Sequence, residues 1–279
     1  MRKFENKVAA ITGSASGIGR ALAIELAAKG CHLALSDVNG EGLAETVEQA
    51  SGLGVRVTSA RVDVANREAV YAWADQVVRE HGKVNLIFNN AGVALGSTVE
   101  KMSYGDFEWL MGVNFWGVVY GTKAFLPHLK ATGNGHIINI SSVFGLAGIP
   151  SQSAYNSAKF AVRGFTESLR QELDMLGYGV SASSVHPGGI KTSIARSARM
   201  DESIRDLGLG REGFDTRDAF EKSFITTPEK AAKAILQGVQ RNQRRILVGP
   251  DARVYDWMVR LLPTAYQRVA VGYARFTAK

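Results

Sequence analysis

The sequence predicts an α/β fold in one domain: a doubly wound parallel sheet of seven strands with helices on both faces. Short apolar segments alternate with helical stretches of roughly ten or more residues, which is the order that a parallel sheet requires. The apolar segments are continuous runs, as expected for strands that are buried on both sides. No Pro-, Gly- or Ser-rich linker and no internal repeat divides the 279 residues.

Seven segments carry the strand pattern. Each is short, rich in Val, Ile, Leu or Ala, and bounded by glycine or polar residues, a composition typical of buried strands. The predicted strands are 8–11, 32–36, 55–61, 86–88, 137–140, 180–185 and 245–248.

Six segments carry the helical pattern, in which apolar residues recur at every third or fourth position. Gly30 follows the first and His81-Gly82 ends the third, both typical helix terminators. Residues from about 191 to 223 show little periodicity and many charges, which indicates a mobile surface segment. The predicted helices are 19–29, 42–50, 67–80, 105–130, 154–176 and 228–240.

Composition narrows the class of protein. With 46% hydrophobic and 21% charged residues, the chain has the make-up of a globular protein. Its net charge of +7 is spread along the chain, without the clustered Lys and Arg that favour nucleic-acid binding. One cysteine excludes an internal disulfide and, with no signal peptide, leads us to expect a cytoplasmic protein. The histidines lack metal-ligand spacing, and no apolar run is long enough to span a membrane.

A glycine-rich turn follows the first predicted strand. It reads Thr12-Gly13-Ser14-Ala15-Ser16-Gly17-Ile18-Gly19 and opens the first helix. Glycine permits positive φ and close backbone approach, and free N–H groups at a helix start attract a pyrophosphate. The spacing G-x3-G-x-G differs from the commoner G-x-G-x-x-G. Its place in the first strand–helix unit nevertheless indicates a dinucleotide site.

Asp37 follows the second predicted strand, 18 residues after Gly19. An acidic residue about 20 positions beyond the turn binds the adenosine ribose hydroxyls in dinucleotide-binding folds. Its carboxylate would repel a 2′-phosphate, and the neighbouring Val38 and Asn39 bring no positive charge. The sequence therefore predicts NAD, with NADP the less favoured cofactor.

Tyr155 and Lys159 lie four positions apart near the start of the second long helix, so their side chains share one face. A neighbouring ammonium favours the phenolate and lowers a tyrosine pKa from its usual value of about 10. Such a phenol is suited to general acid–base catalysis of alcohol/ketone interconversion. The spacing alone is common on helix surfaces, so the pair gains meaning only in combination with other motifs.

Six motifs occur together in one order. They are Thr12-Gly13-x3-Gly17-Ile18-Gly19, Asn89-Asn90-Ala91-Gly92, Asn114, Ser141-Ser142, Tyr155-x3-Lys159 and Pro187-Gly188. In this combination the chain resembles the short-chain dehydrogenase/reductase family from about Lys7 to Val248. The resemblance implies a Rossmann-type fold with a seven-stranded parallel sheet. It also implies a homo-oligomer, either a dimer or a tetramer, with residues 105–130 and 154–176 at the interface. We expect the tetramer.

The resemblance implies four catalytic residues. Tyr155 is expected to act as acid–base, and Lys159 to bind the nicotinamide ribose and lower the pKa of Tyr155. Ser142 is expected to hold and polarise the substrate carbonyl, with Ser141 as its structural neighbour. Asn114 is expected to hold a water that connects Lys159 to solvent.

The resemblance also implies a set of cofactor contacts. Asp63 and Val64 are expected at the adenine, and Thr192 at the nicotinamide carboxamide. Gly188-Gly189 is expected to loosen the entry to the substrate loop. The implied cofactor residues are Gly13, Ser16, Gly17, Ile18, Gly19, Asp37, Asp63, Val64, Asn90, Ala91, Gly92, Tyr155, Lys159, Pro187, Gly188, Ile190 and Thr192.

Six mostly apolar residues are implied around the substrate, which favours a hydrophobic secondary alcohol or its ketone. Lys191, Arg196 and Arg199 leave open an anionic or coenzyme-A-linked substrate, although solvated loop charges are the simpler interpretation. The implied substrate residues are Val93, Ala94, Leu95, Val143, Phe144 and Gln152.

Two other functions stay open. One is an NADP(H)-dependent carbonyl or 3-oxoacyl reductase, against which Asp37 argues. The other is a dinucleotide-binding scaffold without catalysis, against which the intact set Asn114, Ser142, Tyr155 and Lys159 argues.

Residues 251–279 form an amphipathic tail beyond the catalytic, dinucleotide-binding domain, which we assign to residues 1–250 with a substrate loop at about 190–225. Arginines recur in the tail at 253, 260, 268 and 275, and Pro263 is expected to kink or divide its helix. Such a helix can lie on an anionic membrane surface. We favour packing against its own domain or a neighbouring subunit.

Overall fold

The computed structural model describes residues 3–194, 196–208 and 224–277, and it contains the predicted parallel sheet. Its strands are β1 (Val8–Thr12), β2 (His32–Asp37), β3 (Val57–Arg61), β4 (Leu86–Asn89), β6 (Gly135–Ile140), β7 (Val180–Pro187) and β9 (Arg245–Val248). They pair in the order β3-β2-β1-β4-β6-β7-β9, each neighbouring pair parallel. The fold is therefore a Rossmann-like α/β fold in one domain.

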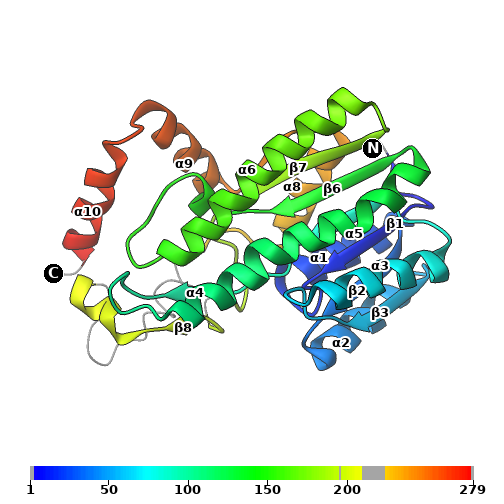
Figure 1. Ribbon diagram of the computed structural model, residues 1–279, viewed down its shortest axis with the longest axis horizontal. Helices are drawn as coiled ribbons and strands as arrows, with labels where there is room; N and C mark the ends of the chain where they lie inside the picture. The colour runs from blue at the N-terminus through cyan, green and yellow to red at the C-terminus, as the bar shows by residue number, and fades with distance from the viewer. Residues whose placement is uncertain (1–2, 195, 209–223, 278–279) are drawn as a thin grey trace.

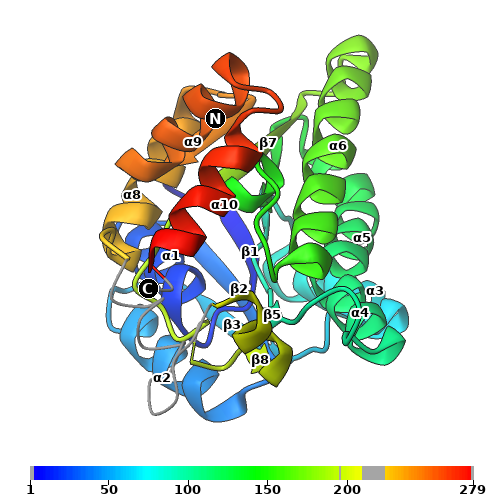
Figure 2. The same cartoon turned by 90° about the vertical axis from the view of Figure 1, so that its left-hand side faces the viewer.

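Helices cover both faces of the sheet (Figures 1 and 2). One face carries α1 (Gly17–Ala27), α2 (Gly40–Ser51) and α8 (Pro228–Gln240). The other carries α3 (Arg67–His81), α5 (Gly117–Thr132) and α6 (Ser153–Leu176). In Figure 1 the strands point toward the C-terminal helices α9 (Pro250–Leu261) and α10 (Tyr266–Thr277). The carboxyl ends of the strands thus face these two helices.

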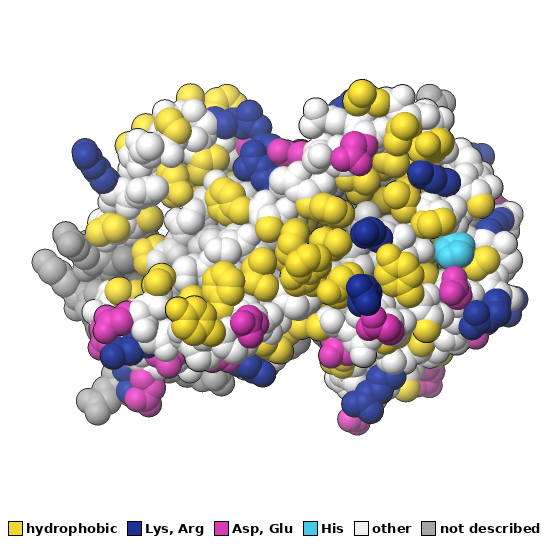
Figure 3. Space-filling model, viewed as in Figure 1, with side chains coloured by type: hydrophobic (Ala, Val, Ile, Leu, Met, Phe, Trp, Pro, Cys, Tyr) yellow, Lys and Arg dark blue, Asp and Glu magenta, His cyan; other side chains and the backbone are white. Residues whose placement is uncertain are grey.

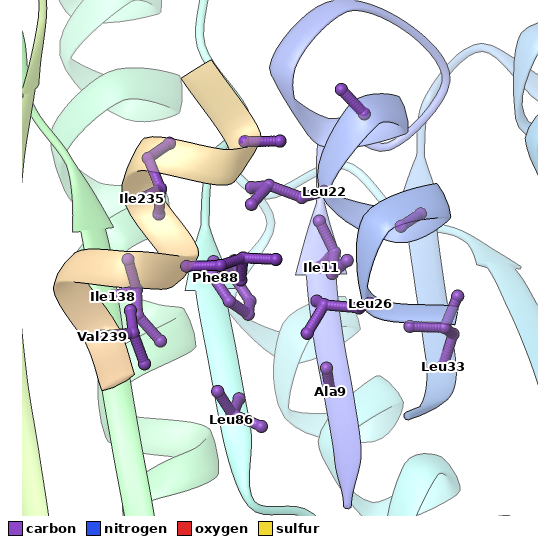
Figure 4. Packing of buried hydrophobic residues seen from close by; sticks show 14 of the residues in the cluster. Ala9, Ile11, Leu22, Leu26, Leu33, Leu86, Phe88, Ile138, Ile235 and Val239 are labelled. Atoms are coloured by element: carbon purple, nitrogen blue, oxygen red, sulfur yellow. The ribbon is translucent and has the colours of Figure 1, made fainter. Parts of the chain in front are cut away.

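The core explains why the strands are continuous apolar runs. Alternate strand residues point to opposite faces, and both faces are covered. On the face shown in Figure 4, strand side chains pack beneath α1 and α8, and each buried Leu, Ile or Phe contributes about 1.5–3 kcal/mol. The fully buried residues in this layer include Ile11, Leu22, Leu26, Leu33, Phe88, Ile138, Ile235 and Val239.

Local signals set the helix ends. The side chain of Asn66 accepts the Ala69 N–H at 2.9 Å and caps the start of α3. Gly82 ends α3 with a φ of +75°, a left-handed conformation that glycine adopts without a steric penalty. Thr227 caps α8, and Pro228 follows at its first position.

Two predicted segments differ from the structure. The predicted helix 105–130 is two helices, α4 (Tyr104–Met111) and α5, joined by a π-helical turn at Gly112–Trp116. In the predicted irregular segment 191–223, β8 (Arg199–Met200) pairs with β5 (Leu95–Gly96), and a 3₁₀ helix, η3, covers Glu202–Leu207. The first part of that segment is thus structured, while residues 195 and 209–223 lie outside the described ranges.

The predicted division of the tail at Pro263 is confirmed, because α9 ends at Leu261 and α10 begins at Tyr266. Val254, Trp257 and Leu261 leave an apolar side of α9 exposed. Within the described ranges, no helix combines the length and the apolar character needed to cross a bilayer.

Candidate active site

A crevice is expected where the strand order reverses. β1 is followed in the chain by β2 on one side, and β4 by β6 on the other, so the switch point lies between β1 and β4. Ligands of doubly wound sheets bind at the carboxyl ends of the strands at such a point. The glycine turn follows β1 there, and Asn90-Ala91-Gly92 follows β4.

Thr12 and Asn90 close the glycine turn against the end of β4. The Thr12 hydroxyl accepts the N–H groups of Asn90 and Ala91, each at 3.0 Å. In return, the Asn90 side-chain amide donates to the carbonyls of Thr12 and Gly13, each at 3.0 Å. A Cβ on Gly13 would lie 2.7 Å from the Ala91 Cα. Glycine is therefore required at this position, where φ is +67°.

The start of α1 is suited to an anion. Ser16 precedes the helix without a side-chain cap, and its first turn carries no acidic residue. Uncapped N–H groups and the helix dipole favour a phosphate at such a place. Thr192 lies close by, because a Cβ on Gly17 would lie 2.9 Å from the Thr192 Cγ2. The turn therefore has the geometry and charge that a pyrophosphate requires.

Asp37 lies beside this turn. One carboxylate oxygen accepts the Ala15 N–H at 2.9 Å, and the other accepts the Asn39 N–H at 2.9 Å. Arg20, which sequence reasoning missed, holds the turn from α1 by donating to the carbonyls of Ala15 and Gly42. Its periodic position on an amphipathic helix gave no signal of this role.

Tyr155 and Lys159 meet Asn114 above Gly92. The Lys159 ammonium lies 5.5 Å from the centre of the Tyr155 ring and donates to the Ile140 carbonyl at 3.0 Å. A Cβ on Gly92 would lie 3.3 Å from the Asn114 Oδ1 and 3.6 Å from the Lys159 Nζ. Residues from three separate segments of the chain thus converge at one point.

Burial governs the charges of this pair. It raises the pKa of Tyr155 to about 12, although a hydrogen bond with Ser142 opposes the rise. Burial also lowers the pKa of Lys159 to about 8. Burial therefore has the largest effect on the pKa of both side chains. The expected lowering of the Tyr155 pKa by Lys159 stays a prediction.

Ser142 is held from two sides. Its hydroxyl accepts the Phe144 N–H at 3.1 Å at the start of the 3₁₀ turn η2 (Val143–Gly145). His186 Nδ1 lies 2.9 Å from the Ser142 carbonyl oxygen. A carbonyl only accepts, so Nδ1 carries the proton and Nε2 accepts from the Ser184 hydroxyl at 3.0 Å. The structure thus ties His186, in the last part of β7, to Ser142.

Asn114 occupies the π-helical turn. Its amide pairs with the backbone of Val93, accepting the N–H and donating to the carbonyl, each at 2.8 Å. Such turns insert one residue into a helix and frequently occur at functional sites. The turn here buries Asn114 completely and turns its amide toward the segment after β4.

The segment after β7 is fixed rather than loosened. Gly188 donates to Val248 at 2.9 Å, and Gly189 donates to an Asp251 carboxylate oxygen at 2.6 Å. A Cβ on Gly188 would overlap the same carboxylate. The expectation of a loose entry at Gly188-Gly189 is thus wrong, because both glycines are packed against Asp251. Beyond them, Ile190 is buried and bridges to Thr226.

The remaining implied cofactor residues lie at the same carboxyl edge. Asp63 follows β3 and accepts the Ala65 N–H at 2.9 Å. Val64 is buried, and a Cβ on Gly117 would lie 2.8 Å from its Cγ2. Val64 therefore packs against the start of α5.

The implied substrate residues surround the Tyr155 ring in part. Leu95 and Val93 belong to an apolar cluster that also contains Tyr155. The Phe144 ring packs edge-on to Tyr155, with centroids 6.1 Å apart. The remaining members lie close in the chain: Ala94 before β5, Val143 before Phe144, and Gln152 before α6.

Arg199 is occupied by other protein groups. Its guanidinium lies 3.6 Å from the Trp109 ring centre and 2.8 Å from an Asp106 carboxylate oxygen. This pairing removes Arg199 from the cations that were considered for an anionic substrate. It also fastens β8 to α4.

The fold and the residues gathered at the carboxyl edge of its sheet define a dinucleotide-binding oxidoreductase. Residues 7–203 match the sequence profile of the short chain dehydrogenase family. The chain belongs to this family.

Three proteins that are similar to this chain differ in how closely they match it, and the two solved structures among them hold different ligands. The putative oxidoreductase SadH of Mycobacterium tuberculosis is 53% identical to this chain, over 99% of this chain and 98% of the SadH chain. A short chain dehydrogenase/reductase from Burkholderia phymatum, in complex with NAD, has a TM-score of 0.84 and 34% identity over 96% of both chains. An alcohol dehydrogenase from Thermococcus sibiricus, complexed with 5-hydroxy-NADP, has a TM-score of 0.73 and 28% identity over 87% of this chain and 95% of its own.

Proposed function

We propose that this protein is an NAD-dependent dehydrogenase that interconverts a hydrophobic secondary alcohol and its ketone, with Tyr155 as acid–base. The observation that carries the proposal is that Tyr155 lies between Lys159, 5.5 Å from the centre of its ring, and Ser142, its hydrogen-bond partner. When bound, the nicotinamide supplies or accepts the hydride. The protein's own residues handle the proton and the oxygen.

Tyr155 removes the hydroxyl proton of the alcohol in oxidation and returns it to the ketone oxygen in reduction. Ser142, which shares a hydrogen bond with Tyr155, holds that oxygen at the same point. Lys159 stabilises the phenolate once a proton has left, and Asn114 holds the water that connects Lys159 to solvent. Positioned hydrogen-bond donors of this kind stabilise charge that develops on oxygen.

The dinucleotide would lie along the carboxyl edge of the sheet. The turn at Gly13, Ser16, Gly17, Ile18 and Gly19 would hold the pyrophosphate, supported by the uncapped start of α1. Asp37 would bind the adenosine ribose, and Asp63 and Val64 the adenine. Asn90, Ala91, Gly92 and Lys159 would hold the nicotinamide ribose, and Pro187, Gly188, Ile190 and Thr192 the nicotinamide.

NAD is favoured over NADP by Asp37. Its carboxylate lies against the turn through Ala15, where a 2′-phosphate would meet a negative charge. The Burkholderia relative with NAD supports this preference, and the Thermococcus relative with an NADP-type ligand supports the alternative. Initial rates with NADH and NADPH at equal concentration decide between them. A clear preference for NADPH contradicts the assignment and favours the carbonyl or 3-oxoacyl reductase.

Tyr155→Phe tests the acid–base role. We expect turnover of secondary alcohols to fall at least about a hundredfold, while NADH binding, followed by nucleotide fluorescence, is retained. Tyr104→Phe is the matched control, since Tyr104 is 90% exposed. Retention of more than about a tenth of the activity in Tyr155→Phe contradicts the proposal.

Self-association as a homotetramer is part of the proposal, with α5 and α6 at the interface. Apolar side chains gather over these helices in the middle of the face in Figure 3. Exposed apolar residues in this part of the chain are Phe160 of α6, 40% exposed, and Trp116, which directly precedes α5 and is 47% exposed. Exposed apolar side chains that gather in this way are typical of interaction surfaces. Light scattering after chromatography measures the assembly, and Phe160→Glu is expected to reduce its mass.

A further inference from the structure

The C-terminal arm, by which we mean α9 and α10 (residues 250–277), lies next to the candidate active site. Figure 1 shows the connection between β6 and α6 lying between α6 and the arm, and Figure 2 shows α10 in front of the carboxyl ends of the strands. That connection, residues 141–152, carries Ser142 and Phe144. The arm therefore contacts the segment that faces the reacting group.

Tyr266 is the main contact of α10. Its hydroxyl accepts the Gly148 N–H at 3.0 Å, and the residue is only 8% exposed. Among residues 266–272, whose side chains are described, it alone is buried. Tyr266 is therefore buried by its contact with the 141–152 connection, and not because α10 packs a continuous apolar face against the domain.

Three aromatic rings lead from the arm to the acid–base. Tyr255 of α9 packs edge-on to Phe144, with centroids 6.4 Å apart, and Phe144 packs edge-on to Tyr155 at 6.1 Å. Edge-to-face rings at these separations attract one another beyond the effect of their burial. The position of Phe144 therefore depends on the arm.

Asn156 holds the same connection from the inner side. Its amide donates to Phe144 at 2.7 Å and to Ala147 at 2.9 Å, and it accepts the Ile149 N–H at 3.0 Å. Asn156 and Tyr266 thus fix the backbone from Phe144 to Ile149, one from α6 and the other from the arm. A connection held in this way can form a wall of defined shape.

We propose that Tyr255 and Tyr266 determine substrate specificity, forming with Phe144 the outer wall of the substrate site and selecting secondary alcohols with a bulky apolar or aromatic substituent. The inference rests on the proposed function and deepens it. Tyr255 and Phe144 present aromatic surface to the large substituent, and Tyr266 fixes that surface through Gly148. A small alcohol such as propan-2-ol reaches Tyr155 without using this wall.

The test compares Tyr255→Leu and Tyr266→Phe with wild type on propan-2-ol and 1-phenylethanol. We expect KM for 1-phenylethanol to rise about tenfold in Tyr255→Leu and by a smaller factor in Tyr266→Phe. KM for propan-2-ol and kcat for both alcohols stay within about twofold of wild type. Trp257→Leu is the matched control, because Trp257 is on the same helix as Tyr255 but 65% exposed.

Calorimetric binding of acetophenone to each variant, with NADH present, separates this inference from the proposed function. If wild type binds acetophenone but turns over neither alcohol, and Tyr255→Leu binds acetophenone more weakly, the proposed function is contradicted. The inference that Tyr255 and Tyr266 shape the substrate site is then supported. If KM changes equally for both alcohols, or for neither, the specificity role of Tyr255 and Tyr266 is contradicted while the proposed function is not. A wild type that neither binds acetophenone nor turns over an alcohol overturns both.

Discussion

The imidazole of His186 and the backbone of Ser142 are joined by a 2.9 Å hydrogen bond between β7 and the end of β6. The histidine is completely buried, and burial lowers its pKa to about 4. It is therefore neutral at ordinary pH and acts as a positioning residue for Ser142.

His186→Ala is expected to lower kcat about ten- to hundredfold, because a displaced Ser142 would no longer meet the substrate oxygen that we propose it holds. His136→Ala is the matched control, since His136 is equally buried and pairs with Ser183 away from the site. Both changes lower stability. Only His186→Ala lowers the rate per folded molecule, and His186→Asn, which keeps a donor, restores part of it. Equal rates in the two alanine variants contradict the positioning role.

The two buried histidines make the fold sensitive to acid. Burial lowers the pKa of His136 to about 3 and that of His186 to about 4, below the ordinary value of 6.5. Below pH 6.5 the unfolded chain binds protons that the folded chain excludes, so stability falls as the pH falls toward 4. From pH 7 to pH 5 the free energy of unfolding decreases by about 2 kcal/mol for each histidine. Urea unfolding at the two pH values measures it, and equal stabilities contradict the effect.

Lys159→Met is expected to stabilise the protein while removing its activity. Burial lowers the pKa of Lys159 from 10.5 to about 8, so at pH 7 the folded protein carries an ammonium that burial disfavours. Replacing it gains about 2 kcal/mol after loss of its hydrogen bond to Ile140. The gain shrinks as the pH rises from 8 to 10.5, because the neutral amine no longer opposes folding. Thermal unfolding across this range is the measurement, and a destabilised variant at pH 7 contradicts the expectation.

Gly188→Ala is expected to destabilise the protein by about 3 kcal/mol and to weaken NADH binding, because the new methyl overlaps the Asp251 carboxylate. Gly52→Ala serves as control, since its nearest neighbour would be 3.6 Å from the added Cβ. Denaturant unfolding and NADH titration are the readouts. Similar values for the two variants contradict the packing argument.

Asp256→Asn is expected to free the base of the C-terminal arm. Asp256 pairs with Arg245 of β9 at 3.0 Å and with Arg260 at 2.8 Å, and Arg245 reaches Glu167 of α6 at 2.7 Å. Charged side chains meet between α9 and α6 in Figure 3. We expect Asp256→Asn to lower the free energy of unfolding by about 2 kcal/mol and to speed proteolytic cleavage within the arm. Glu68→Gln, which removes an exposed pair with Arg67, leaves cleavage unchanged; equal cleavage of the two variants contradicts the role.

Sequence patterns predicted the sheet, the glycine turn after β1 and the break in the C-terminal tail. Each of these depends on a local signal: apolar runs, glycines and Pro263, respectively. The π-helical turn at Asn114 was missed because its residues retain a helical pattern. The extra residue there depends on the pairing of Asn114 with Val93, 21 positions away in the chain.

Long-range contacts explain the other differences. The role of Gly188-Gly189 depends on Asp251, 62 positions beyond Gly189. The regular structure of β8 depends on its two-residue pairing with β5 and on the contact of Arg199 with the Trp109 ring. Neither contact produces a periodic pattern in the sequence. The raised pKa of Tyr155 depends on burial that only the assembled fold creates.

The paired bonds of Thr12 and Asn90 have a consequence for affinity. They join the ends of β1 and β4, where we propose that the dinucleotide binds. Rigid sites of this kind lose little conformational entropy when a ligand binds. Loosening that seam, as Thr12→Val does, should make complex formation entropically more costly while leaving the list of ligand contacts intact.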